Sequence, residues 1–185
     1  MIMRNIYSNR LLVASFILIG TLVWTSPSLA ENPQHVSPEK IESQDKRFID
    51  NGDGTITDTK TKLMWMKKDS YQQTRHWINW MESFDYIKKA NENGFSNYYD
   101  WQMPTLEDLK TLYESHKTNS RQVGREMIIH IDPIFEKEGS GVWWALEANG
   151  HFNAFGIEFN SGSRFSAPKK SKARKAVRPM RVITP

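Results

Sequence analysis

Five cationic side chains lie within seven positions in the run KKSKARK, near the end of the 185-residue sequence. They are Lys169, Lys170, Lys172, Arg174 and Lys175. Lysine presents a compact ammonium and arginine a planar fork of donors, so such a run can bind sulfate, phosphate or carboxylate groups. The run predicts a polyanion-binding site, although an exposed loop that only aids solubility would have the same composition.

The whole C-terminal end is basic, whereas the body of the chain is mildly acidic. Seven of the 25 Lys and Arg residues lie in the last 19 positions, where there is no acid. Residues 31–166 carry 16 basic residues and all 21 acidic ones. This separation of charge favours contact with a polyanion and is equally typical of a solvated tail.

Three aspartates in the run DNGDGTITD could supply the oxygen ligands that calcium prefers. An EF-hand loop starting at Asp50 needs ligands at its third and fifth positions, where Gly52 and Gly54 stand instead. A tight turn between two strands explains both glycines, because glycine adopts positive φ without strain. We therefore predict a hairpin and no cofactor, while a different calcium geometry from Asp50, Asp53 and Asp58 stays open.

The residue patterns typical of catalytic sites are missing from this sequence. It has no cysteine, which excludes disulfides, thiol nucleophiles and thiolate ligands. The five histidines are not spaced as HxxxH, HxH or HExxH, so no local zinc site is predicted. His130 and Asp132, in HIDP, could pair or bind a metal, and a loop contact explains them as well. We predict no catalytic residue, and the convergence of distant positions keeps an enzyme as the alternative.

The first thirty residues have the three parts of a secretory signal peptide. Arg4 and Arg10 give a positive start, Leu11 to Trp24 is apolar, and Ser28-Leu29-Ala30 is a small-x-small cleavage signal. The apolar stretch is shorter than the ~20 residues that a spanning helix needs. We therefore predict cleavage and a periplasmic or secreted protein without a membrane span, followed by a flexible polar leader over 31–45 and one domain over 46–185.

The hydrophobic patterning of residues 46–185 predicts an α+β fold. Trp77, Trp80, Met81, Phe84 and Ile87 fall on one stripe of a helix over 74–93, with Thr74 as its N-cap, and core packing is the expected role of that stripe. A second helix is expected to begin after Thr105, with Asp108 completing a capping box. Residues 114–134 have no clear period and are expected to be a long connection.

Short alternating segments predict antiparallel strands on both sides of the helices. The first group covers 47–50, 55–59 and 62–65, and the second covers 142–146 and 152–159, joined through Asn149-Gly150. A last strand is expected around Val177 to Val182, confined to a sheet edge or a bulge by Pro179.

This order of segments resembles the Lcl C-terminal domain family, a domain of unknown function named after a bacterial collagen-like adhesin. The resemblance covers about residues 46–183 and rests on RFIDNGDGTITDTKTKLMW, DWQMPTLEDLKTLY, VWWALEA with AFGIEFNSG, and VRPMRVI. It implies a C-type-lectin-like fold, with a twisted antiparallel β core, two flanking helices and long loops, related to the formylglycine-generating and sulfatase-modifying domains. The chain departs from the family in lacking cysteine and in carrying the lysine-rich run 169–175.

The named adhesin binds sulfated glycosaminoglycans, so the resemblance implies an exported, non-catalytic binding domain. The expected partner is a sulfated or acidic polysaccharide, or another envelope or extracellular partner, and a nucleic acid is not expected after export. Two alternatives remain. One is an enzyme of unknown chemistry on the sulfatase-modifying-like fold, and the other is a purely structural envelope protein that associates through Trp143 and Trp144.

Overall fold

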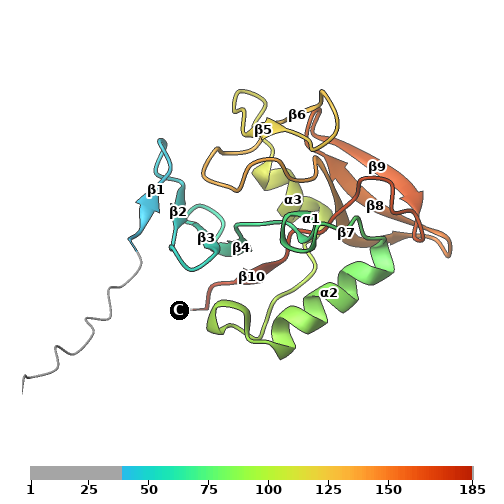
Figure 1. The fold of residues 1–185 in the computed structure, drawn as a ribbon, viewed down its shortest axis with the longest axis horizontal. Helices are drawn as coiled ribbons and strands as arrows, with labels where there is room; N and C mark the ends of the chain where they lie inside the picture. The colour runs from blue at the N-terminus through green and yellow to red at the C-terminus, as the bar shows by residue number, and fades with distance from the viewer. Residues whose placement is uncertain (1–38, 185) are drawn as a thin grey trace, which may run out of the picture. The chain divides into compact units, whose positions relative to one another are not determined.

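The computed structural model describes residues 39–184, and this part of the chain is an α+β domain (Figure 1). The predicted signal peptide and residues 31–38 of the predicted leader lie outside the described residues. A five-stranded sheet has the order β1-β2-β3-β4-β10, a three-stranded sheet the order β7-β8-β9, and β5 pairs with β6. Every pairing of these strands is antiparallel. No helix among residues 39–184 is both long and apolar enough to cross a membrane.

The strands are β1 Ile41–Glu42, β2 Phe48–Asp50, β3 Thr55–Asp58, β4 Leu63–Met66, β5 Ser120–Arg121, β6 Ile128–Ile129, β7 Val142–Asn149, β8 Asn153–Glu158, β9 Ser163–Pro168 and β10 Met180–Val182. The helices are α1 Ser70–Thr74, α2 Trp80–Glu92, α3 Leu106–Leu112 and the 3-10 turn Phe95–Asn97.

Ordered structure begins before residue 46, the first residue of the predicted domain. Strand β1 pairs with β2 through Ile41 opposite Asp50 and Glu42 opposite Ile49. The Ser43 hydroxyl accepts the Phe48 backbone N–H at 2.9 Å and so closes the turn between these strands. The end of the predicted leader therefore forms the outer strand of the larger sheet.

The two helices differ in how well the sequence pattern locates them. Helix α3 begins after Thr105, which forms the predicted capping box with Asp108. The expectation that a helix starts at Thr74 is wrong, because Thr74 is the last residue of α1 and the next helix starts at Trp80. Asn79 and Glu82 form a complete capping box there, and this local start overrides the longer apolar stripe.

The later start of α2 changes which of its apolar residues are buried. Ile87 is 6% exposed, as a core residue should be. Met81 and Phe84, which were expected in the core, are 57% and 37% exposed. The first two turns of α2 therefore present apolar side chains to solvent.

Two apolar clusters fill opposite faces of the sheets. Because side chains alternate along a strand, Trp65 enters the cluster that holds α3, whereas Met64 and Met66 enter the cluster that holds α2. Trp143 and Trp144 separate in the same way, and both are fully buried. The described chain thus places these two tryptophans in the core, which is the ordinary role of such a pair.

A buried ionic group lies at the centre of the domain. The Arg178 guanidinium stacks 4.4 Å from the Trp143 ring centroid, and its Nη1 donates to the carbonyls of Met66 and Lys67 at 2.7 and 2.5 Å. Burial lowers the pKa of Arg178 to about 10, so it stays charged at neutral pH. Asp69 is also fully buried and supplies opposite charge, with Gln72 between the two.

Candidate functional site

The five cations of the predicted polyanion site lie in the segment that joins β9 to β10. This segment begins at Lys169, whose backbone N–H donates to the Phe152 carbonyl at 2.8 Å, and a turn follows at Ser171. Arg174 has a φ of 53°, in the left-handed region. The segment re-enters the fold at Ala176, which bridges to Trp143 in parallel. The cations therefore lie on a short segment, residues 169–175, whose two ends are fixed. This segment is called the arch below.

Lys175 is not available to a ligand. Its side chain is buried, with its ammonium 5.5 Å from the Trp144 ring centroid and hydrogen-bonded to the Ser171 hydroxyl at 3.2 Å. Burial lowers the pKa of Lys175; Glu158 opposes that shift and Arg125 adds to it. Lys175 is thus a cation held under aromatic rings, and the arch has four candidate binding cations rather than five.

The other four cations differ in their surroundings. Lys172 pairs with Glu82 at 2.5 Å, although its side chain stays 55% exposed. The Lys169 ammonium lies 4.9 Å from the Trp80 ring centroid and donates to the Gly150 carbonyl at 3.1 Å. Lys170 and Arg174 have no carboxylate within ion-pair distance among residues 39–184. These two are the cations best placed to meet an anion.

Arg174 lies beside a second group of cations, which the sequence pattern did not single out. A methyl group placed on Gly124 would lie 3.8 Å from Nη2 of Arg174. Gly124 belongs to the loop between β5 and β6, and this loop and residues 137–138 line a cavity of about 760 Å³. Its charged lining residues are Arg121, Glu126, Arg125, Lys137 and Glu138.

The charge of that cavity is positive on balance. Arg121 pairs with Glu126, whereas Arg125 and Lys137 have no such partner in the described part of the chain. Arg174 of the arch lies beside Gly124 of this lining, which brings the local charge to four cations against two carboxylates. The signal in the sequence is SRQVGRE, in which Arg121 and Arg125 flank a glycine that allows a tight loop.

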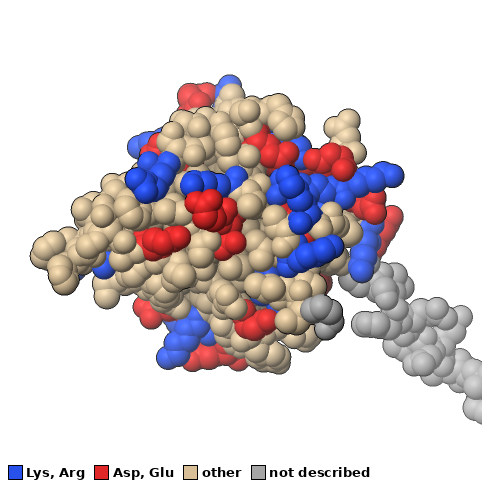
Figure 2. Space-filling view, turned by 180° about the vertical axis from the view of Figure 1, so that it is seen from behind, with Lys and Arg blue, Asp and Glu red and all other residues tan. Residues whose placement is uncertain are grey.

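One face of the domain carries both signs of charge without separation. Figure 2 shows basic and acidic side chains interspersed there, in patches of a few residues each. Such a mixture gives no extended field of one sign on that face. Local groups of unpaired cations, such as Lys170 and Arg174, therefore matter more than the formal net charge of +4.

The three aspartates of the DNGDGTITD hairpin are each engaged within the fold. Asp50 pairs with Lys67 at 2.6 Å, and Asp53 accepts the Thr55 hydroxyl at 2.6 Å. Asp58 pairs with Arg47 at 2.6 Å. Burial alone would raise the pKa of Asp58, but Arg47 outweighs it and holds that pKa below its usual value. No cluster of three metal-ligating side chains occurs within residues 39–184.

Calcium is expected to leave the melting temperature of the protein unchanged. The predicted hairpin turn accounts for all three aspartates. Asp50 and Asp58 already pair with cations, and Asp53 accepts a hydrogen bond within the turn. Thermal unfolding followed with millimolar calcium and with a chelator would check this. A melting temperature that rises with calcium concentration would contradict it, because a ligand that binds the folded state stabilises it by mass action.

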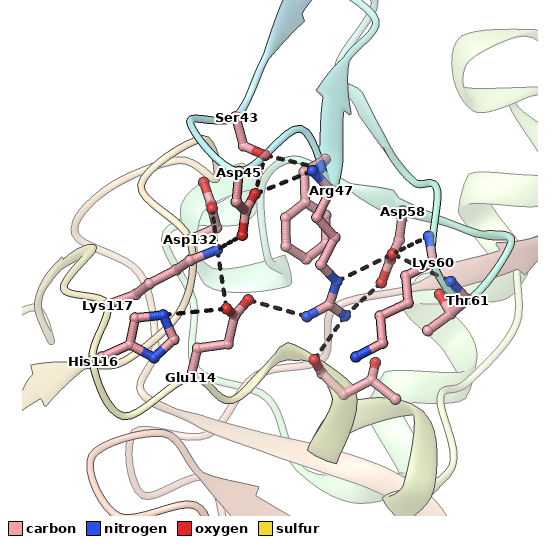
Figure 3. A network of polar contacts seen from close by, with 12 residues as sticks. Ser43, Asp45, Arg47, Asp58, Lys60, Thr61, Glu114, His116, Lys117 and Asp132 are labelled. Atoms are coloured by element: carbon pink, nitrogen blue, oxygen red, sulfur yellow. Dashed lines mark hydrogen bonds and ion pairs between the residues drawn. The ribbon is translucent and has the colours of Figure 1, made fainter.

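A polar network around Lys117 fixes the start of the domain (Figure 3). The Lys117 ammonium lies 2.5 Å from a carboxylate oxygen of Asp45, 2.7 Å from Asp132 and 3.0 Å from Glu114. Burial alone would lower the pKa of Lys117, but these three carboxylates raise it well above its usual value. The hydrogen bond from Lys117 likewise holds the pKa of Asp45 well below its usual value.

The predicted HIDP pair is separated by this network. Asp132 faces Lys117, whereas the His130 ring nitrogen Nδ1 lies 2.7 Å from the Lys117 carbonyl oxygen. His116 stands at the exposed edge, 3.8 Å from Glu114. The geometry is that of a loop held by ion pairs.

Comparison with known proteins identifies the family of this chain. No curated protein matches the sequence. Residues 54–181 match the Lcl C-terminal domain, and this range holds α1 to α3, the arch, and every strand from β3 to β9. The match covers well over half of the sequence, so the chain belongs to the Lcl C-terminal domain family.

Proposed function

We propose that this chain is an exported, non-catalytic binding domain that recognises a polyanion, and that its ligand is a sulfated or acidic polysaccharide. We propose further that its antiparallel sheets and flanking helices are a C-type-lectin-like fold. Export rests on the signal peptide that the sequence predicts. The ligand class rests on the resemblance to an adhesin that binds sulfated glycosaminoglycans and on the cations around the arch.

The observation that carries the proposal is the meeting of Arg174 with the loop between β5 and β6. Three segments far apart in sequence place Arg125 and Lys137 in the lining of one cavity and Arg174 beside that lining, without carboxylate partners in the described chain. Like charges held together repel one another, and a bound anion removes that repulsion. Two guanidinium groups can each also bind a pair of oxygens of a sulfate or carboxylate group.

A K170S/R174S variant is expected to elute from immobilised heparin at clearly lower salt than the wild-type protein. Each cation that contacts the polyanion contributes about one unit to the slope of log affinity against log salt, so losing both lowers that slope by about two. Lys175 is kept because it is buried beneath Trp144, and its removal would also disturb the core. Binding measured at several salt concentrations gives the slope.

The matched control is K88S/K89S, which removes the same charge from the exposed side of α2. Lys88 makes only an exposed pair with Glu92, so this variant should fold normally. Equal weakening by the two variants would mean that heparin responds to net charge alone. That result, or retention of K170S/R174S at wild-type strength, would remove the proposed site.

A further inference from the structure

The start of α2 and the tip of the β7–β8 hairpin lie next to the arch (Figure 1), and each carries an exposed aromatic side chain. Phe152 is 84% exposed, and Phe84 is 37% exposed. The ring of Phe84 packs edge-on against Trp80, with centroids 4.7 Å apart. Large apolar side chains gathered on a surface typically mark a binding site, since exposing them to water is unfavourable.

Backbone hydrogen bonds fix these rings beside the lysines. The Lys169 N–H donates to the Phe152 carbonyl at 2.8 Å, and the Trp80 N–H donates to the Lys169 carbonyl at 3.1 Å. The indole N–H of Trp80 donates to the Ala145 carbonyl at 2.8 Å. The hairpin tip, the first residue of the arch and the first turn of α2 are therefore one rigid unit.

The lysines of this unit differ in how they are held. The Lys169 ammonium covers the Trp80 ring and donates to the Gly150 carbonyl, so it is held in place. Lys170 is exposed and follows directly in sequence. The unit thus carries both aromatic rings and ammonium groups, and Phe152 is the most exposed of its aromatic residues.

We propose that Phe152 is the stacking platform for a sugar ring of an acidic polysaccharide, with Lys169 and Lys170 receiving its carboxylate or sulfate groups. This inference rests on the proposed function and specifies that the site selects polyanions that contain sugar rings. A pyranose ring presents polarised C–H groups on its flat face, and these suit the electron-rich face of an aromatic ring. A polyphosphate chain has the charge without any such face, so the platform discriminates between the two.

The charges on this surface favour a polysaccharide over a protein partner. The cores of protein interfaces are depleted in lysine, whereas Lys169 and Lys170 sit among the exposed rings here. A single-stranded nucleic acid could also stack a base on Phe152, since every base has a π face. It is therefore included in the test as a competing ligand.

The test compares F152S with wild-type protein on heparin, inorganic polyphosphate and single-stranded DNA at two salt concentrations. A lost stacking contact costs about 1.4 kcal/mol at this kind of site, so F152S should bind heparin about tenfold more weakly. Binding to polyphosphate should stay within about twofold, because the lysines remain. The F152Y variant keeps the ring and should bind heparin as the wild-type protein does.

The matched control is Y99S, which removes another exposed ring, one that is 69% exposed and lies outside the arch and the hairpin. It should leave heparin binding unchanged. Loss of less than about twofold for heparin in F152S, or equal losses for heparin and polyphosphate, would overturn the platform while leaving the proposed function intact. A loss for DNA as large as that for heparin would overturn its selectivity for sugars. A wild-type protein that binds neither heparin nor polyphosphate would overturn the proposed function itself.

Discussion

An R178M variant is expected to lose about 3–5 kcal/mol of folding free energy, the cost of removing one member of a buried charged group. Methionine keeps much of the volume beside Trp143, so the loss reports charge and hydrogen bonding rather than a cavity. The carbonyls of Met66 and Lys67 lose their donor, and Asp69 loses the positive charge nearest to it in the core. Chemical denaturation at pH 7 measures the change.

The pH dependence of this variant gives a second check. Burial already raises the pKa of Asp69 in the wild-type protein, while Arg178 opposes that rise. Without Arg178, the pKa of Asp69 in the folded state rises further above its pKa in the unfolded state. The variant therefore loses stability as the pH rises from the unfolded-state pKa to the folded-state pKa. The difference in unfolding free energy between R178M and the wild-type protein should therefore shrink as the pH falls from 7 towards 5.

The R181M variant is the control for R178M. Arg181 lies three positions after Arg178, in β10, but its partner Asp100 is 51% exposed at the side chain. A pair with an exposed member contributes about 1 kcal/mol or less. If R178M and R181M lost equal stability, the buried charge at position 178 would have no special role.

A K117M variant is expected to be the second most damaging substitution, with a loss of about 2–4 kcal/mol at pH 7. Removing the ammonium leaves Asp45, Asp132 and Glu114 facing one another without a cation between them. The loss is smaller than for Arg178, because Asp45 is 42% exposed and solvent screens part of the repulsion. Thermal unfolding at pH 7 and pH 4 measures it.

The sign of the pH effect distinguishes repulsion from lost packing. In the wild-type protein, Lys117 holds the pKa of Asp45 below its unfolded value, so its stabilisation is lost only in strong acid. In K117M the three carboxylates repel one another without the ammonium between them, so the deficit in stability is expected to be smaller at pH 4 than at pH 7. A deficit that stays constant from pH 7 to pH 4 would show that Lys117 acts through its alkyl chain alone. K110M is the control, since Lys110 makes only an exposed pair with Glu107.

Local signals in the sequence located the elements whose causes are local. The capping box of Thr105 and Asp108 gave the start of α3, because both partners lie within one turn of helix. The glycines of DNGDGTITD gave the first hairpin, since Gly52 and Gly54 have φ values of 74° and 90°. The apolar stripe from Trp77 to Ile87 predicted a helix that starts too early, because periodicity alone does not show where a capping box begins the helix.

The candidate site depends on contacts between segments far apart in sequence. Composition therefore could not show which of its cations are exposed and which are buried. Lys170 and Lys175 have the same chemistry in one run, yet Lys170 is exposed and Lys175 lies beneath Trp144. Arg178, only three positions further on, is fully buried. The neighbours that decide these roles come from α1, β7 and the loop before β7, none of which is adjacent to the run in the chain.

Strand β10 pairs with β4 and completes a sheet whose other four strands lie within residues 41–66. During synthesis, β4 must therefore wait for a partner that is made much later than itself. Pairing across so long a loop is slow, because the entropy of closing the loop is lost before any contact compensates it. A protease that removed the residues from Arg178 onwards would take away both this partner and the central guanidinium. Molecules cut before Arg178 are thus expected not to reach the native state.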